Sequence, residues 1–290
     1  MLDLKGKVAV VTGGASGVGL ALVRVLAGEG MKIAVADVDQ NALDAAVAEL
    51  TAGGTEAIGV KADVSKQESM DAAADAVFAA FGKVHLLFNN AGVGLGEAQR
   101  RIWTLPEKDW NWGFAVNVMG IVHGIRAFVP RMLEGGEEGM VINTSSANGG
   151  LFALPATPIY AATKAAVTAL TETLQFQFLM DKTKLRAAVL FPGPHVVNTR
   201  IMASNRVRPA EFSDGTEKAA AYNNMRELAE ASGLKMQLTE PEEVAEFALA
   251  SVKADRFWMF PESDAHNAIL RNRVENIIAR GDLPIPNLGI

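Results

Sequence analysis

Short apolar runs alternate with longer amphipathic segments along most of the chain. The longer segments carry apolar residues at helical spacing, and the short runs are continuous, as is typical of strands buried on both faces of a parallel sheet. The predicted strands lie near residues 7–12, 32–36, 56–62, 84–89, 139–145, 185–191 and 256–260. This order implies right-handed crossovers and predicts an α/β fold with a doubly wound parallel sheet of about seven strands. No linker or internal repeat interrupts it, so residues 1–290 are expected to form a single domain.

The first predicted strand leads into the glycine-rich segment Gly13-Gly14-Ala15-Ser16-Gly17-Val18-Gly19, which is followed by a helical segment that stops at Gly30. Strand, glycine-rich turn and helix together predict a phosphate cradle, because the backbone can approach a pyrophosphate and the helix N-terminus supplies N–H donors. The second predicted strand ends at Asp37, whose carboxylate can accept hydrogen bonds from an adenosine ribose. A tight turn without a ligand is the alternative.

Other polar or glycine-containing segments also follow predicted strands: Asn89–Gly92, Ser145-Ser146 and Pro192-Gly193. In an open parallel sheet the carboxyl ends of the strands meet at one edge, where ligands bind. We therefore expect these distant segments to form one site.

Tyr160 and Lys164 stand four residues apart at the start of a predicted helix, so they share one face. A free phenol has a pKa of about 10 and is a poor proton acceptor at neutral pH. A neighbouring ammonium would favour the phenolate and lower that pKa. The pair is therefore suited to exchanging a proton with an alcohol or a ketone, although the spacing alone also occurs in helices without such a role.

The ordered set of motifs resembles the short-chain dehydrogenase/reductase family over roughly residues 2–199. The matching stations are Thr12-Gly13-x-x-x-Gly17-x-Gly19, Asn89-Asn90-Ala91-Gly92, Asn117, Ser146, Tyr160-x-x-x-Lys164, Pro192-Gly193 and Thr199. The resemblance implies a Rossmann-like fold, an NAD(P)-dependent oxidoreductase, and a homodimer or homotetramer.

The resemblance also implies the catalytic roles. Tyr160 would exchange the substrate proton, and Lys164 would lower the tyrosine pKa and hold the nicotinamide ribose. Ser146 would bind the substrate oxygen, with Ser145 as the alternative. Asn117 would hold a water linked to Lys164, unless its amide has a purely structural role.

The cofactor contacts implied by the resemblance are Gly13, Ser16, Gly17, Val18, Gly19, Asp37, Asp63, Val64, Asn90, Ala91, Gly92, Tyr160, Lys164, Pro192, Gly193 and Thr199. Asp63 could equally cap the following helix. NADP-using relatives commonly carry a basic residue where this chain has Ser16 or Val38, while Asp37 and Asp39 add negative charge. The sequence therefore predicts NAD in preference to NADP.

The sequence departs from the usual family pattern in four places, two of which affect its larger organisation. Residues 200–240 exceed the length of an ordinary connection, and we expect an enlarged, mobile lid, with packed helices at an oligomer interface as the alternative. Residues 261–290 are expected to form a C-terminal extension with a helical tail. These departures resemble a subgroup acting on bulky aromatic alcohols, including the Cα-dehydrogenases of lignin-derived aryl ethers.

Apolar side chains suited to a substrate pocket, or alternatively to packing, are Leu95, Trp103, Leu151, Phe152, Leu154, Met202, Phe212, Tyr222 and Met225. The expected substrate is a hydrophobic secondary alcohol or ketone, aromatic ones included. A ketoreductase for acyl-carrier or steroid-like substrates and a non-catalytic dinucleotide sensor are the alternatives.

Composition narrows the remaining choices. The net charge is −6 without a basic stripe, which argues against nucleic acid as a partner. There are no cysteines and the 4 histidines lack metal-ligand spacing, so no metal site is expected. Without an uncharged apolar run long enough for a bilayer, we expect no membrane partner and a cytoplasmic protein.

Overall fold

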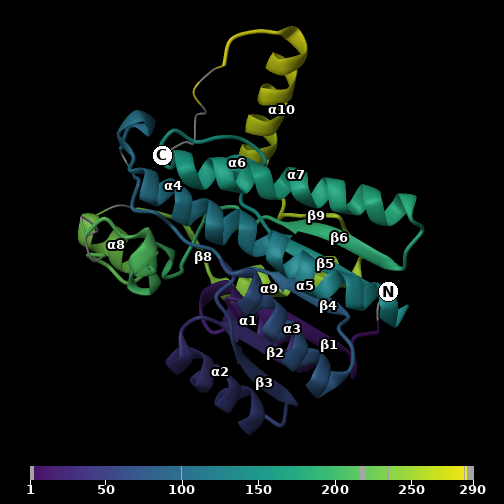
Figure 1. The fold of residues 1–290 in the computed structure, drawn as a ribbon. Helices are drawn as coiled ribbons and strands as arrows, with labels where there is room; N and C mark the ends of the chain where they lie inside the picture. The colour runs from purple at the N-terminus through teal and green to yellow at the C-terminus, as the bar shows by residue number, and fades with distance from the viewer. Residues whose placement is uncertain (1–2, 99, 216–219, 234, 284, 286–290) are drawn as a thin grey trace.

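A computed structural model describes residues 3–98, 100–215, 220–233, 235–283 and 285, and its centre is a parallel sheet (Figure 1). The strand order is β3-β2-β1-β4-β5-β6-β9. The strands are β1 (Val8–Thr12), β2 (Lys32–Asp37), β3 (Ala57–Lys61), β4 (Leu86–Asn89), β5 (Gly139–Thr144), β6 (Leu185–Leu190) and β9 (Trp258–Met259). This confirms the predicted doubly wound, Rossmann-like α/β sheet. The order in which successive strands are added to the sheet reverses between β1 and β4, and such folds bind ligands at that point.

Helices cover both faces of the sheet (Figure 1). They are α1 (Gly17–Gly28), α2 (Gln40–Ala52), α3 (Gln67–Phe81), α4 (Glu107–Phe114), α5 (Gly120–Gly135), α6 (Ala147–Gly150), α7 (Pro158–Met180), α8 (Met225–Ser232), α9 (Pro241–Lys253) and α10 (Asp264–Ala279). One apolar core joins the sheet to α3, α4, α5 and α7, and the other joins it to α1, α2 and α9.

Strand β1 shows why its apolar run is continuous. Val10 belongs to the first core and Val11 to the second, and neither is exposed. Successive strand side chains point to opposite faces, so a strand covered on both sides needs apolar residues at every position. Burying each valine contributes about 1.5–3 kcal/mol.

Helices α4 and α5 form one continuous helical segment through the π-helix Ala115–Met119. This segment, Glu107–Gly135, has the length and apolar composition of a membrane span, contrary to the expectation that the chain has no such run. However, 67% of its apolar window is buried inside the protein. We therefore interpret it as a core helix.

The first part of the expected lid is attached to the body of the protein. Two short 3-10 helices, Ile201–Val207 and Ala210–Phe212, are followed by α8 and by β8 (Leu238–Thr239), which pairs with β7 (Val196–Val197). Arg208 forms a buried ion pair with Asp109 of α4 at 2.7 Å, and its guanidinium lies 4.8 Å from the centre of the Trp112 ring. Mobility therefore stays a prediction for the later part of residues 200–240.

The C-terminal helix α10 projects away from the sheet at the top of Figure 1. None of its residues is buried. Residues beyond it are described only in part, so the predicted helical tail is present over α10 itself.

Candidate active site

The glycine-rich segment forms a tight turn between β1 and α1. Gly13 and Gly17 have φ angles of +63° and +52°, a backbone conformation that favours glycine. A Cβ at Gly19 would lie 2.0 Å from the Gly13 carbonyl oxygen, and one at Gly13 would lie 2.9 Å from the Ala91 Cα. Side chains at these positions would therefore disrupt the close packing of the turn.

The N-terminus of α1 has the features of a phosphate-binding site. Ser16 is the N-cap, and its side chain makes no capping hydrogen bond to α1. The first N–H groups of a helix carry a partial positive charge and need acceptors from outside the helix. This helix end is compatible with the pyrophosphate contacts expected for Ser16, Gly17, Val18 and Gly19, which stay a prediction.

Asp37 connects the end of β2 to the glycine-rich turn. Its Oδ2 accepts a hydrogen bond from the Ala15 N–H at 3.0 Å, and its Oδ1 accepts one from the Asp39 N–H at 3.0 Å. Each carboxylate oxygen can accept a further hydrogen bond. The position is therefore compatible with the predicted recognition of a ribose.

Arg206 is a charged residue near this end of the site that the sequence argument did not consider. Burial lowers the pKa of Arg206, and the neighbouring Arg200 lowers it further, while Asp39 and Asp37 oppose both. The prediction of NAD rests on Ser16, Asp37, Val38 and Asp39, whereas the guanidinium of Arg206 arrives from a distant segment of the chain.

The loop after β4 is fastened to the glycine-rich turn through Thr12. The Thr12 Oγ1 accepts hydrogen bonds from the N–H groups of Asn90 and Ala91 at 3.0 and 3.1 Å. A Cβ at Gly92 would lie 3.4 Å from Asn117 Oδ1 and 3.7 Å from Lys164 Nζ. The structure thus brings the predicted segment 90–92, Asn117 and Lys164 together.

Asp63 has a local role in the turn that leads to α3. Its Oδ1 accepts hydrogen bonds from the N–H and hydroxyl of Ser65 at 3.0 and 2.6 Å. The N-cap of α3 is Lys66, so Asp63 is not the helix cap that was considered as an alternative. Val64 is buried, and its carbonyl accepts a hydrogen bond from His123 Nδ1 at 2.8 Å. The adenine contact of both residues stays a prediction.

Tyr160 lies in the first turn of α7 and forms a side-chain hydrogen bond with Ser146. Burial raises the pKa of Tyr160 to about 12, the bond with Ser146 opposes this, and the charge of Glu97 adds to it. Desolvation is therefore the largest effect on the phenol in this structure. The lowering of the Tyr160 pKa by Lys164, expected from the four-residue spacing, stays a prediction.

Lys164 is buried beneath the same turn. Its Nζ donates a hydrogen bond to the Thr144 carbonyl at 2.7 Å and lies 5.5 Å from the centre of the Tyr160 ring. Burial lowers the pKa of Lys164 to about 8.

The two neighbouring serines have different environments. Ser145 is 1% exposed, and its Oγ donates to the Lys164 carbonyl at 2.8 Å and lies 2.9 Å from Thr168 Oγ1. Ser146 is half-buried and contacts Tyr160. This arrangement favours Ser146 over Ser145 as the group that meets a substrate.

Asn117 lies in the π-helical turn and is fully buried. Its Oδ1 accepts from the Val93 N–H at 2.8 Å, and its Nδ2 donates to the Val93 carbonyl at 3.1 Å and to Thr163 Oγ1 at 3.2 Å. These bonds fasten the loop after β4 to α7. A structural role is therefore present, and the predicted water link to Lys164 stays a prediction.

The segment after β6 folds over the glycine-rich turn. Gly193 has a φ angle of +65°, and a Cβ there would lie 2.7 Å from Thr239 Oγ1. A Cβ at Gly17 would lie 3.2 Å from the Thr199 methyl carbon. Pro192, Gly193 and Thr199 therefore lie at the predicted edge of the sheet, with Thr199 beside the turn at α1.

Glu97 is a residue at this site that the sequence reasoning missed. It is 2% exposed, and its two carboxylate oxygens accept hydrogen bonds from the N–H groups of Ile159 and Tyr160 at 2.6 and 2.9 Å. An acidic residue within the apolar, glycine-rich stretch that follows Gly92 was the available signal.

The predicted pocket residues divide into three groups. Leu151, Phe152 and Leu154 belong to an apolar cluster with Phe191 and Phe260, and His266 of α10 packs edge-on against Phe152. Several others pack or are partly covered instead: Leu95, Phe212, Met225 and Tyr222. The two exposed ones are Trp103, at 80%, and Met202. The cluster that contains Phe152 is largely buried, and it is the apolar cluster closest in sequence to Ser146.

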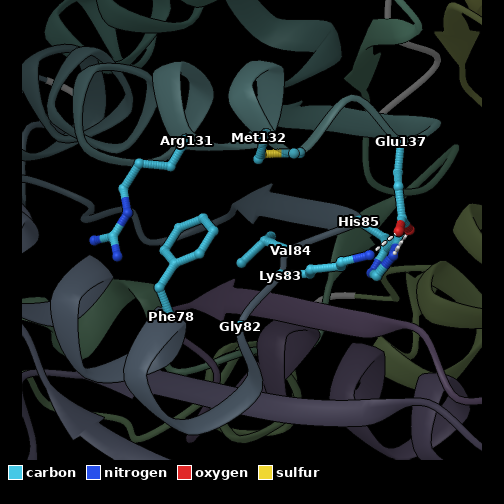
Figure 2. Close-up of a pocket in the computed structure, with 9 residues that line it drawn as sticks. Phe78, Gly82, Lys83, Val84, His85, Arg131, Met132 and Glu137 are labelled. Atoms are coloured by element: carbon cyan, nitrogen blue, oxygen red, sulfur yellow. Dashed lines mark hydrogen bonds and ion pairs between the residues drawn. The ribbon is translucent and has the colours of Figure 1, made fainter.

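A small hollow of about 20 Å³ lies at the opposite edge of the sheet (Figure 2). Its lining includes Phe78, Lys83, His85, Arg131 and Glu137. Residues 83–85 and 137 precede β4 and β5, so this is the amino edge, and the hollow is about large enough for one water molecule. It is not the candidate active site.

Comparison with known proteins identifies the class. The family model for short chain dehydrogenases matches residues 7–209, and the chain belongs to the short-chain dehydrogenase/reductase family of oxidoreductases. A short chain dehydrogenase/reductase from Burkholderia phymatum, solved in complex with NAD, is 38% identical with a TM-score of 0.87, covering 99% of this chain and 98% of that one.

Two characterised relatives extend the comparison. A C alpha-dehydrogenase from Sphingobium sp. strain SYK-6 is 32% identical over 93% of this chain and 85% of its own length. A 1-deoxy-11-beta-hydroxypentalenate dehydrogenase from Streptomyces exfoliatus is 33% identical over 99% and 94%. Both are similar along almost the whole chain, including the regions outside the family model.

Proposed function

We propose that this protein transfers a hydride between the nicotinamide of NAD and the carbinol carbon of a hydrophobic secondary alcohol or the corresponding ketone. The observation that carries this proposal is the contact of Ser146 with Tyr160 above the buried Lys164, at the strand edge that also holds the glycine-rich turn. NAD, when bound, supplies the hydride acceptor or donor.

The chain's own residues account for the proton and the substrate oxygen. Ser146 donates a hydrogen bond to that oxygen, and Tyr160 gives its phenol proton to a ketone or takes one from an alcohol. Because the pKa of Tyr160 is raised to about 12, the neutral phenol is the resting form and serves as the acid in ketone reduction. Alcohol oxidation needs the phenolate and is therefore favoured by higher pH.

NAD is proposed in preference to NADP. The carboxylates of Asp37 and Asp39 at the end of β2 support this choice because they would repel a 2′-phosphate. Arg206 opposes it, since the charges of both aspartates act on this guanidinium. We give the carboxylates more weight, because Asp37 directly contacts the glycine-rich turn at Ala15.

The apolar cluster around Phe152 supports a hydrophobic substrate, including aromatic alcohols of the kind that the name of the Sphingobium relative suggests. We further propose a cytoplasmic homodimer or homotetramer. Exposed apolar side chains on α7, Phe176, Leu179 and Met180, support association with another copy.

A screen of aromatic and alicyclic secondary alcohols with NAD and with NADP tests the proposal. Reduction of NAD with at least one hydrophobic alcohol, abolished in Tyr160→Phe, is the expected result. Turnover that survives Tyr160→Phe would remove the proposed role of the phenol, and binding of NAD without turnover of any alcohol would favour the non-catalytic sensor.

A further inference from the structure

Glu97 is the only residue from outside α7 whose side chain bonds the first N–H groups of that helix in the described part of the chain. Pro158 opens α7 and has no N–H, and the N-cap residue Thr157 makes no side-chain capping bond. The first free donors, at Ile159 and Tyr160, both go to Glu97. A carboxylate 62 residues earlier in the chain therefore caps the helix that carries the phenol.

A buried carboxylate is a costly way to cap a helix. A hydroxyl at the N-cap can satisfy one such donor without burying a charge, but the N-cap Thr157 makes no such bond here. Here the two N–H bonds and the positive end of the helix compensate for the charge in part. Burial still raises the pKa of Glu97, the two backbone bonds oppose this, and the nearby Asp109 adds to it.

We propose that Glu97 is a positioning residue for catalysis: its carboxylate fixes the first turn of α7, and its negative charge strengthens the hold of the Tyr160 phenol on its proton. The inference rests on the proposed role of Tyr160 in proton exchange. No family motif in the sequence includes Glu97.

Among the charged groups around Tyr160, Glu97 is the negative one that acts on the phenol. A nearby anion disfavours the phenolate, and the charge of Glu97 contributes to the raised pKa of Tyr160. Lys164 of α7 is the nearby cation, but its Nζ is bonded to the Thr144 carbonyl. Asp109 of α4 is neutralised by Arg208 at 2.7 Å and by Arg100 at 3.6 Å. The consequence is that the phenolate of Tyr160, the form that alcohol oxidation needs, forms at higher pH than it would without Glu97.

The chain allows a direct test, because it contains only 2 tyrosines, Tyr160 and Tyr222. In a Tyr222→Phe background, tyrosinate absorbance reports the titration of Tyr160 alone and requires no turnover. In that background, Glu97→Gln is expected to shift the midpoint to lower pH. Glu107→Gln, which removes an equally negative but exposed charge, is expected to leave the midpoint where it was.

Glu97→Asp and the pH profile of alcohol oxidation test the role of Glu97 independently of Glu97→Gln absorbance. Glu97→Asp withdraws the charge by one methylene group, so we expect it to shift the Tyr160 midpoint in the same direction as Glu97→Gln, but by less. If Glu97→Gln does not fold, the Glu97→Asp variant tests the proposal. The pH profile of alcohol oxidation, in enzyme that retains Tyr222, is expected to move to lower pH in Glu97→Gln. An unchanged tyrosinate midpoint in the folded Glu97 variants would overturn the proposal, whereas a shifted midpoint without any turnover would count against the proposed function instead.

Discussion

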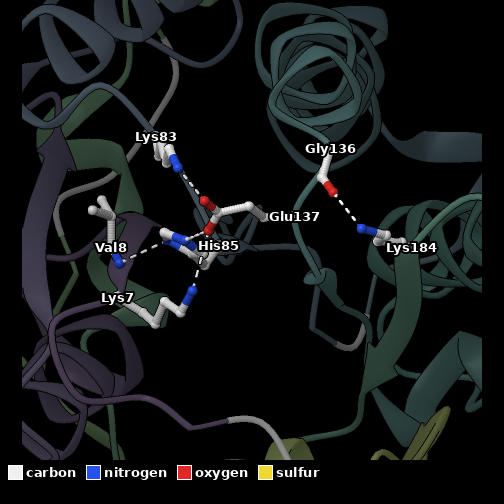
Figure 3. Close-up of polar contacts among 7 residues, drawn as sticks. All are labelled: Lys7, Val8, Lys83, His85, Gly136, Glu137 and Lys184. Carbon is white, nitrogen blue, oxygen red and sulfur yellow. Dashed lines mark hydrogen bonds and ion pairs between the residues drawn. The ribbon is translucent and has the colours of Figure 1, made fainter.

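Glu137 at the amino edge of the sheet and Tyr160 and Lys164 at the carboxyl edge have environments that favour opposite charge states. At the amino edge, the Glu137 carboxylate bonds to Lys7 Nζ at 3.1 Å, to His85 Nε2 at 2.7 Å and to Lys83 (Figure 3). These partners lower the pKa of Glu137 to about 2. At the carboxyl edge, burial raises the pKa of Tyr160 to about 12 and lowers that of Lys164 to about 8. The amino edge thus stabilises the charged form of Glu137, whereas the carboxyl edge stabilises the neutral forms of Tyr160 and Lys164.

This difference separates a structural network from a chemical site. The partly exposed ion pairs of Glu137 with Lys7 and Lys83 contribute modestly to stability. At the carboxyl edge the groups are held by backbone contacts and desolvation, and strongly perturbed pKa values of this kind cluster at functional sites. A cluster of charged residues is therefore a weaker indication of function than groups whose neutral forms the fold imposes.

The largest predicted effect is at the carboxyl edge. Tyr160→Phe is expected to lower kcat by roughly 10²–10⁴-fold, because the only proposed proton-exchanging group is lost. Binding of NAD, measured by fluorescence titration, is expected to persist. Glu137→Gln at the amino edge is the control and is expected to keep kcat near the wild-type value. Retention of most activity in Tyr160→Phe would contradict the assignment.

A smaller effect is expected from the cofactor end of the same edge. Asp37→Ala combined with Val38→Arg is expected to shift the ratio of kcat/KM values toward NADP by roughly tenfold or more, since a hydrogen bond to a charged group contributes about 1.5–3 kcal/mol. Arg206→Ala is the matched variant and is expected to shift the ratio toward NAD. A wild-type enzyme that already prefers NADP would show that Arg206, and not Asp37, decides cofactor choice.

The amino edge is expected to affect stability rather than turnover. The folded-state pKa of Glu137 is depressed to about 2, so its stabilisation is present above the ordinary value of about 4.5 and is lost as pH falls from there toward 2. Glu137→Gln is therefore expected to flatten the pH dependence of the urea midpoint in that range. Glu138→Gln, an exposed neighbour, controls for net charge. An equal pH dependence in wild type and Glu137→Gln would show that the network contributes nothing measurable.

His85 extends the same comparison to higher pH. Its Nδ1 accepts the Val8 N–H at 3.0 Å, so Nε2 carries the proton and donates to Glu137. Burial lowers the pKa of His85, with the bond to Glu137 opposing. Its contribution to stability is therefore present above the ordinary pKa of about 6.5 and is lost as pH falls below it.

The smallest expected effect concerns the predicted lid, residues 200–240. Hydrogen exchange at residues 220–233 is expected to slow when NAD and a substrate analogue bind, because this part would close over the cleft. Residues 201–212 are expected to exchange slowly in both states, since Arg208 anchors them to Asp109. Slow exchange over the whole segment, unchanged by ligands, would favour the interface interpretation over the lid.

Local sequence patterns determined much of this molecule. The continuous apolar runs predicted the parallel sheet, because a strand covered on both faces has no polar position. Gly13, Gly17 and Gly19 predicted the turn at α1, since its backbone needs left-handed angles and close approach. The four-residue spacing placed Tyr160 and Lys164 on one face of α7 for equally local reasons.

The electrostatics of the site were decided only by the tertiary structure. The Tyr160 pKa depends on desolvation and on Glu97, and both arise from packing between segments far apart in the chain. Lys164 meets the Thr144 carbonyl, and Arg206 comes under the influence of Asp37, for the same reason. Residue spacing specifies which groups share a helix face, but the direction of a pKa shift depends on the solvent and charge that the whole fold removes or supplies.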